Sequence, residues 1–155
     1  LSSGTIPEDP FPETPMNDLL PAWTYTWRHG IAPCLPLNGL RALERALRRN
    51  DYNLIQGQCT APASSSPEDA ELLCFRACAI GFCYLATHAG PTKGEVEDFF
   101  AEVVRDCDQA LGEPAASRHF FNWYDGSTRE EAFRLLLTEV QYSIRVRTRH
   151  TKAVA

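Results

Sequence analysis

The chain has 155 residues, of which 44% are hydrophobic, and it contains six cysteines. This length suits one domain and allows a hydrophobic core that needs no disulfide or metal to hold it together. A net charge of −5 and an isoelectric point of about 5.3 argue against a protein whose whole surface is built to bind nucleic acid. We therefore expect one small globular domain.

Residues 1–21 predict an extended arm. They include five prolines and four acidic residues but no basic residue, and such a composition does not form a packed element on its own. We expect polyproline II geometry, with the arm lying along its own core or along a partner through Phe11, Leu19 and Leu20. The arm lacks the basic and then apolar stretch of a signal peptide, which favours an intracellular, cytoplasmic protein.

An aromatic segment follows the arm. Trp23, Tyr25 and Trp27 alternate with threonines, and this period of two predicts a short extended segment with its aromatic face turned inward. Beside His29 the cluster can bind a ligand, or it can close the end of a core. We expect Trp23 and Trp27 to contribute to partner binding.

Residues 38–50 predict an amphipathic helix with Asn38 as its N-cap. The apolar stripe consists of Leu40, Leu43 and Leu47, and the opposite face consists of Arg41, Arg45, Arg48 and Arg49. Four arginines on one face can grip a phosphate backbone, face solvent, or pair with acidic residues elsewhere in the fold. A later helix supplies such acidic residues: Glu95, Glu97, Asp98, Glu102, Asp106 and Asp108.

The most hydrophobic stretch lies in the middle of the chain and predicts a buried central helix at about residues 67–88. Apolar side chains fall on every side of its helical wheel, and Arg76 is the only charged residue from position 72 to position 86. A helix with this pattern is surrounded by protein. Ser66 and Pro67 provide the N-cap and the first helical position, and Gly90 ends the helix. The acidic first turn and Arg76 argue against a membrane span.

The six cysteines are Cys34, Cys59, Cys74, Cys78, Cys83 and Cys107. The three on the predicted central helix point in different directions, so they do not converge on one metal ion or favour a disulfide. We interpret them as small apolar core residues in the reduced form. We expect no metal and no cofactor.

Two capping boxes predict helices in the second half of the chain. Thr92 and Glu95 open the first, which has a broad apolar face and ends near Gly112. Thr128 and Glu131 open the second in the same way. A hydroxyl at the N-cap and a carboxylate three residues later satisfy two backbone donors that a helix start leaves free.

A shorter helix that starts at Pro114 is expected between these two, followed by a turn at Asp125 and Gly126. We predict that the last helix reaches about Tyr142, while alternating apolar residues leave 140–148 open between helix and strand. The expected plan is an arm at 1–21, a domain of about four to six helices at 22–144, and a basic tail at 145–155.

The Gly-Gln-Cys tripeptide that ends at Cys59 is similar to the nucleophile motif of transglutaminases. This resemblance implies a cysteine-dependent enzyme in which Cys59, or alternatively Cys78, is the nucleophile. His119 then acts as the base and Asp125 orients it. The chain departs from that family at Thr60, where the family has tryptophan, and in the serine-rich loop that follows.

Four further motifs occur in chain order: Gln-Gly at 56–57, Cys-Ala-Ile-Gly at 78–81, Phe-Asn-Trp-Tyr-Asp at 121–125, and Thr-x-Glu-Glu at 128–131. Together they resemble a family of small uncharacterised actinobacterial and phage proteins, which pair a Cys-Ala-x-Gly helix with a Trp-Asn-Asp loop. Tyr124 stands where that family has asparagine. The resemblance covers residues 40–140 and implies an all-helical domain with no assigned activity.

These features favour a non-enzymatic interaction or assembly protein, which docks on a protein partner through its arm and aromatic segment. Two alternatives stay open. One is a small cysteine-dependent hydrolase or acyltransferase, and the other is a nucleic-acid-associated accessory protein that uses the arginine face. The sequence leaves the oligomeric state open.

Overall fold

The structure is a computed structural model that describes residues 20–61 and 76–154. Within these two ranges the chain forms six α-helices and a two-stranded antiparallel sheet. The prediction of a small all-α domain is therefore confirmed. Most of the predicted arm, including Phe11 and Leu19, lies outside the described residues.

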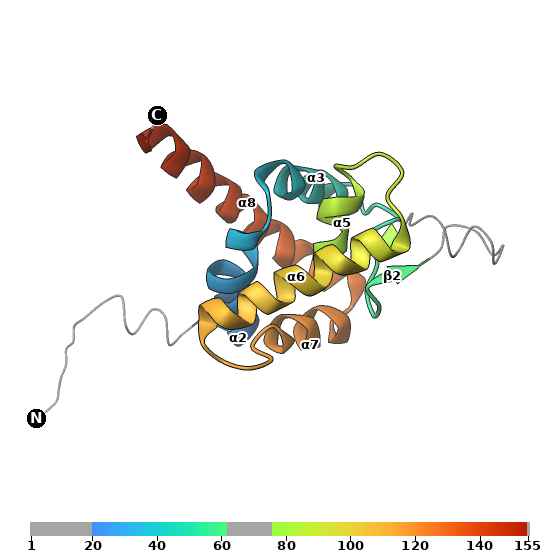
Figure 1. Cartoon of the computed structure of the whole chain (residues 1–155), viewed down its shortest axis with the longest axis horizontal. Coiled ribbons are helices and arrows are strands. Elements are labelled where there is room, and N and C mark those ends of the chain that lie inside the picture. Colours follow the sequence, from blue (N-terminus) through green and yellow to red (C-terminus); the bar gives the residue numbers. More distant parts are fainter. Residues whose placement is uncertain (1–19, 62–75, 155) are drawn as a thin grey trace, which may run out of the picture.

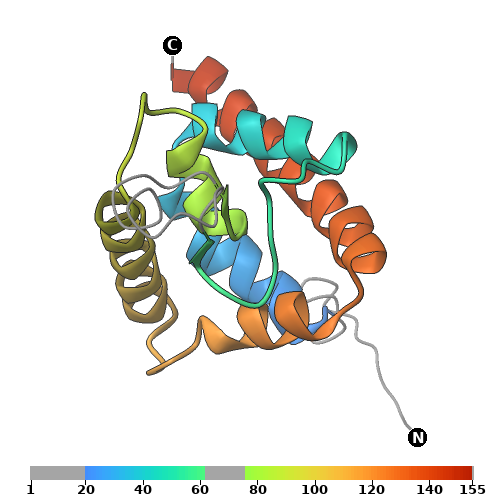
Figure 2. The ribbon, with the colours of Figure 1, turned by 90° about the vertical axis from the view of Figure 1, so that its right-hand side faces the viewer.

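The elements follow one another as α2 (Ala22–Thr26), the π turn η1 (Trp27–Ile31), the 3₁₀ turn η2 (Ala32–Cys34), α3 (Leu37–Arg48), β2 (Thr60–Ala61), β3 (Arg76–Ala77), α5 (Ala79–Leu85), α6 (Lys93–Leu111), α7 (Arg118–Gly126) and α8 (Arg129–Val154). In Figure 1, α6 crosses the molecule and α8 leads away toward the C-terminus. Figure 2 shows α3, α6, α7 and α8 around the outside, with α5 between them.

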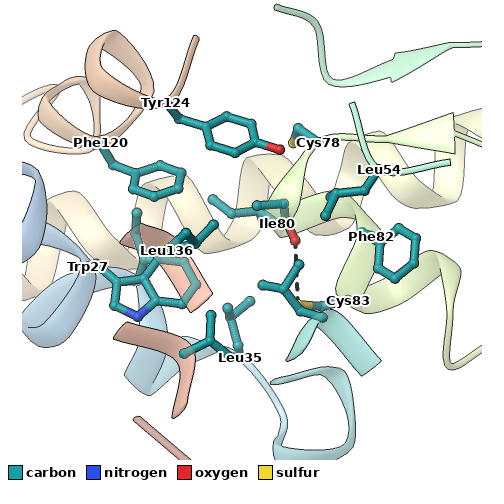
Figure 3. Close-up of a cluster of buried hydrophobic side chains, with 14 of the residues drawn as sticks. Trp27, Leu35, Leu54, Cys78, Ile80, Phe82, Cys83, Phe120, Tyr124 and Leu136 are labelled. Atoms are coloured by element: carbon teal, nitrogen blue, oxygen red, sulfur yellow. Dashed lines mark hydrogen bonds between the residues drawn. The ribbon is translucent and has the colours of Figure 1, made fainter. Parts of the chain in front are cut away.

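Large side chains from several helices meet in the core. Trp27, Phe120, Tyr124 and Leu136 are fully buried, and they lie with Ile80 of α5 in one cluster (Figure 3). The Phe120 ring centroid is 5.4 Å from that of Trp27 and 5.5 Å from that of Tyr124. A helix as short as α5 is unstable alone in water. The burial of its side chains in this cluster therefore stabilises it.

The central helix is buried as predicted, but the prediction of its length is wrong. Its helical part is α5, while Arg76 and Ala77 form strand β3. The Ala77 N–H donates to the Asn53 carbonyl and its carbonyl accepts from Ile55, each over 2.9 Å. These long-range bonds replace helical ones, and a continuous apolar run does not distinguish a buried strand from a buried helix. The predicted start at Ser66 lies outside the described residues.

The aromatic segment is helical, so the prediction of an extended segment is wrong. Trp23 and Trp27 are four residues apart, and this spacing places both on one face of a helix. Trp23 stacks on Trp123 of α7 with 3.6 Å between ring centroids, and Trp27 is fully buried. Tyr25, between them, is 42% exposed. Trp23 and Trp27 therefore fit both a period of two and one helical face, whereas Tyr25 fits only the period of two.

The arginine-rich helix predicted at 38–50 forms as α3 from residue 37 to residue 48, with Leu40, Leu43 and Leu47 buried and its arginines exposed. Its start differs by two positions, because Pro36 precedes the first helical residue and Asn38 lies inside the helix. Three alternatives were open for this face, and the ion pairs that its arginines form in the described part of the chain are with nearby residues rather than with the acidic helix. Arg48 pairs with Glu44 and Arg49 pairs with Asp51.

The two capping boxes predicted in the second half of the chain lie at the starts of α6 and α8. Thr92 and Glu95 form a complete capping box at the start of α6, and Gly112 ends α6 in the left-handed region with φ of 68°. The Glu131 N–H donates to the Thr128 hydroxyl over 3.2 Å at the start of α8. Local side-chain bonds fix these boundaries, which is why the sequence alone predicts them.

Helices α7 and α8 differ from the prediction. Helix α7 begins at Arg118 rather than at Pro114, and it continues through Asp125 and Gly126, where we expected a turn. Helix α8 continues to Val154, so residues 140–148 are helical and the predicted basic tail is the end of this helix. The apolar residues of 140–146 alternate, yet in the helix they divide between the core side and solvent.

One glycine permits a close helix contact. A Cβ atom at Gly39 of α3 would lie 2.8 Å from the Cβ atom and 3.3 Å from the carbonyl oxygen of Cys83 in α5. Both Cys83 atoms are fixed by the backbone of α5. The approach of α3 to α5 therefore requires a residue without a side chain at position 39.

Candidate functional site

The structure brings together part of the predicted cysteine triad. Cys59 and Cys78 share a hydrogen bond between their thiols, and Asp125 lies near them with a carboxylate oxygen that accepts from the Gly57 N–H over 2.8 Å. His119 is elsewhere. Its Nε2 atom lies 3.3 Å from a carboxylate oxygen of Glu113, on the exposed side of α7.

The Cys78 sulfur lies in a polar environment inside the core. The hydrogen bond from Cys59 lowers the pKa of the Cys78 thiol, and further hydrogen bonds from the Gly81 and Ile80 amides lower it as well. Burial and the nearby Asp125 carboxylate act in the opposite direction but are outweighed. Cys78 is thus 4% exposed, and yet the hydrogen bonds to its sulfur lower the pKa of its thiol.

The pKa values of the other three described cysteines, Cys34, Cys83 and Cys107, shift in the opposite direction. Burial raises the pKa of the Cys83 thiol far above its ordinary value and raises that of Cys107 to about 12. Burial also raises the pKa of Cys34, whose thiol donates to the Gly30 carbonyl over 3.3 Å. These three cysteines fill space in the core, as predicted. Within the described ranges, no three metal-binding side chains gather to hold an ion.

Residues 50–57 are fastened to the junction of α7 and α8, and this loop leads to Cys59. The Gln56 side-chain amide donates to the carbonyl oxygens of Tyr124 and Ser127, over 2.6 and 3.0 Å. The Tyr124 hydroxyl donates to the Ile55 carbonyl over 2.8 Å. In Figure 3 this hydroxyl points toward Cys78.

Arg129 fixes the start of the same loop. Its guanidinium donates to the Asn50 side chain over 2.7 Å and to the carbonyl oxygens of Asp51 and Leu54, each over 2.6 Å. The sequence analysis included Gln56 in a motif but missed Tyr124 and Arg129 as anchors of this loop. Their roles depend on contacts across 69 to 79 chain positions, for which the sequence gives no local signal.

A second feature is an apolar groove between η1–η2 and the C-terminal half of α8. It has a volume of about 210 Å³ and is lined by Arg28, Ala32, Pro33, Tyr142, Ser143, Val146, Arg147 and His150. Tyr142 is 38% exposed and Val146 is 43% exposed. They are four residues apart on α8, so they present one continuous apolar face to solvent. We call this feature the α8 groove.

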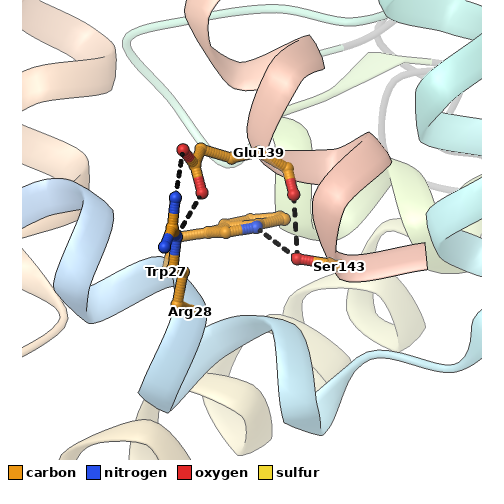
Figure 4. A network of polar contacts seen from close by, with 4 residues as sticks. All are labelled: Trp27, Arg28, Glu139 and Ser143. Atoms are coloured by element: carbon orange, nitrogen blue, oxygen red, sulfur yellow. Dashed lines mark hydrogen bonds and ion pairs between the residues drawn. The ribbon is translucent and has the colours of Figure 1, made fainter. Parts of the chain in front are cut away.

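Partly buried polar contacts hold the two walls of the α8 groove together. Arg28 of η1 donates to both carboxylate oxygens of Glu139 in α8, over 2.8 and 3.2 Å. The Trp27 indole N–H donates to the Ser143 hydroxyl over 3.1 Å, and this hydroxyl donates to the Glu139 carbonyl over 2.9 Å (Figure 4). Arg147 adds bonds from α8 to the other wall, at the carbonyl of Ala32.

The residues predicted to bind a partner differ in their exposure to solvent. Trp23 and Trp27 are core residues, 9% and 0% exposed, and their contribution to partner binding stays a prediction. Leu20 is half-buried at the start of α2. Arg41, Arg45 and Arg48 of α3 and the following Arg49 are on the surface. Two of these arginines form the ion pairs with Glu44 and Asp51.

The fold and these features define a small helical domain with a buried thiol pair and an apolar surface groove. No protein-family model, curated protein or solved structure matches this chain. The resemblance to the actinobacterial and phage family therefore stays a prediction. In the described part of the chain, each helix is too short or too polar to cross a bilayer.

Proposed function

We propose that this chain is a non-enzymatic interaction protein, and that its α8 groove binds an acidic segment of a protein partner through one apolar anchor side chain. The observation that carries the proposal is the exposed pair of Tyr142 and Val146 at the groove. Apolar faces of this kind, bordered by charged groups, are typical of surfaces that bind other molecules.

The size of the groove supports a single anchor. Its volume of about 210 Å³ is below the 300–1,000 Å³ that is typical of sites for cofactors and other small molecules. A leucine or aromatic side chain at the centre of an interface needs less room than a whole ligand, and such buried anchors carry much of the binding energy in protein complexes.

The charge of the surrounding surface supports an acidic partner. After Glu139 the sequence has no further acidic residue, and it has four basic ones at positions 145, 147, 149 and 152. Arg28 adds a cation at the groove, although Glu139 compensates its charge. A positive surface steers an acidic segment toward the groove and determines its orientation.

A displayed library of random peptides tests the proposal. We expect the selected sequences to combine acidic residues with one large apolar residue. Val146→Glu should weaken the selected peptides at least about tenfold, because it places a carboxylate in the apolar groove and repels the acidic peptide. Thr138→Glu adds the same charge at an exposed position of the same helix and is the matched control.

The proposal is overturned if the selected peptides are basic, or if Val146→Glu binds them as well as Thr138→Glu does. Added salt should weaken binding, since part of the attraction is between exposed charges. Retention on immobilised DNA that falls steeply with salt, and that Arg41→Glu with Arg45→Glu removes, would favour the nucleic-acid alternative instead.

The proposed docking of the N-terminal arm requires a separate experiment. Residues 1–19 are removed, and thermal stability and co-purifying proteins are compared with those of the full chain. We expect a loss of co-purifying protein, because the arm carries Phe11 and Leu19 as anchors. If neither stability nor co-purification changes, the arm takes no part in docking.

A further inference from the structure

A pair of neighbouring thiols suggests chemistry that the proposed function does not use. Cys59 directly precedes β2 and Cys78 directly follows β3. These strands are antiparallel, and Thr60 pairs with Ala77. Extending that register by one residue places Cys59 opposite Cys78, and the Cys78 N–H donates to the Cys59 carbonyl over 2.9 Å.

Such a position allows a disulfide without moving the backbone. Residues opposite each other in a hydrogen-bonded antiparallel pair have Cα atoms about 5.5 Å apart, and disulfides have Cα separations of about 4.4–6.8 Å. The two side chains point to the same side, since their thiols share a hydrogen bond. The register and the shared side of the strands therefore bring the two sulfurs to positions that suit an S–S bond.

The two cysteines differ in access. Cys59 is half-buried and follows the exposed residues Gly57 and Gln58, whereas Cys78 is 4% exposed. A reagent from solvent therefore reaches Cys59 first. Cys78 lies behind it, and its sulfur accepts the hydrogen bond from Cys59 and those from the amides of Ile80 and Gly81.

We propose that Cys59 and Cys78 are a redox-active pair, which forms an intramolecular disulfide by exchange with a low-molecular-weight disulfide such as oxidised glutathione. In the first step the Cys59 sulfur attacks one sulfur of the reagent while its proton passes to Cys78. The reagent's S–S bond breaks, a mixed disulfide forms on Cys59, and one glutathione thiolate leaves.

In the second step Cys78 gives its proton to the departed thiolate and attacks the Cys59 sulfur. The mixed disulfide breaks, the Cys59–Cys78 bond forms, and the second glutathione leaves as a thiolate that takes a proton from water. The pair reacts with Cys78 deprotonated, so the protein loses two electrons and one proton, and water supplies the other proton and becomes hydroxide. One molecule of oxidised glutathione becomes two molecules of the reduced form.

Mass spectrometry of the intact full chain after incubation with oxidised glutathione tests this proposal. We expect the wild type to lose two hydrogens and to show a Cys59–Cys78 link in a non-reduced peptide map. Cys78→Ser should take up glutathione more slowly, because it lacks the group that accepts the Cys59 proton. It should then keep one glutathione on Cys59, because it also lacks the resolving thiol. Circular dichroism of each variant confirms that it is folded.

Cys34 is the matched control for reactivity, since it is also half-buried but donates its hydrogen bond to a carbonyl. In the reduced wild type we expect iodoacetamide to label Cys59 at least about tenfold faster than Cys34 near neutral pH. Of the two, Cys59 has a neighbouring thiol of lowered pKa, whose deprotonated form takes up the Cys59 proton. Cys78→Ala should remove this difference.

Three outcomes overturn the proposal. The first is a wild-type protein that keeps glutathione on Cys59 without forming the link. The second is a disulfide from Cys59 to another cysteine, such as Cys74. The third is equal labelling of Cys59 and Cys34 in the folded wild type.

Discussion

Replacement of Gly39 by alanine tests the contact between α3 and α5. Both Gly39 and Gly94 lie in the first turn of a helix, at α3 and α6. A Cβ atom at position 39 would lie 2.8 Å from the Cys83 Cβ atom, whereas one at position 94 meets no atom within 4 Å. The same chemical change should therefore have opposite effects at the two positions.

The expected sizes follow from two competing effects. Alanine stabilises a helix relative to glycine by up to about 1 kcal/mol, partly by restricting the unfolded chain. At position 39 the clash is with backbone-fixed atoms, and overpacking of this kind costs about 1–3 kcal/mol. We expect Gly39→Ala to lower the free energy of unfolding by about 1–2 kcal/mol and Gly94→Ala to raise it by about 0.4–1 kcal/mol.

Urea unfolding followed by tryptophan fluorescence measures both values, and circular dichroism provides a second probe of the same transition. The midpoint should move to lower urea for Gly39→Ala and to higher urea for Gly94→Ala, with similar slopes. If Gly39→Ala is stabilised as much as Gly94→Ala, then α3 and α5 do not approach as closely as described.

Two further stability predictions concern the core. Glu139→Ala should lower the free energy of unfolding in urea by about 1–3 kcal/mol, because it leaves Arg28 without its partly buried partner. Glu102→Ala, which removes a partner from an exposed pair, should change this free energy by less than about 0.5 kcal/mol. Equal losses would contradict the burial of the first pair. The raised pKa of Cys107, about 12, means that the folded state keeps a proton that the unfolded state loses. The contribution of Cys107 to the free energy of unfolding is complete below about pH 9 and declines toward pH 12, by up to about 1.4 kcal/mol per pH unit. In Cys107→Ala the free energy of unfolding should fall less steeply with pH over this range. An unchanged pH dependence would refute the raised pKa of Cys107.

The sequence predicts the parts of the fold that depend on local chemistry. The capping box of Thr92 and Glu95 was found at the correct residues, because its two hydrogen bonds join groups three positions apart. Burial of the α3 leucines follows from their spacing alone. Strand β3 was missed, because its hydrogen bonds go to residues that are distant in the chain.

Both candidate sites depended on such distant contacts. The pairing of Cys59 with Cys78 requires the register of β2 and β3, and we had placed Cys78 inside a long helix. The α8 groove requires that α8 continue beyond Tyr142. The alternating apolar residues leave 140–148 open between helix and strand, although the spacing of four positions between Tyr142 and Val146 equally places them on one helical face.

The contact between Trp27 and Ser143 has a consequence for biosynthesis. The two residues are 116 positions apart, and translation proceeds at about 5–20 residues per second. After the ribosome adds Trp27, about 6–23 s pass before it adds Ser143. During that interval a large aromatic ring lacks the helix that covers it, so the nascent chain is open to chaperones and to aggregation until α8 is made.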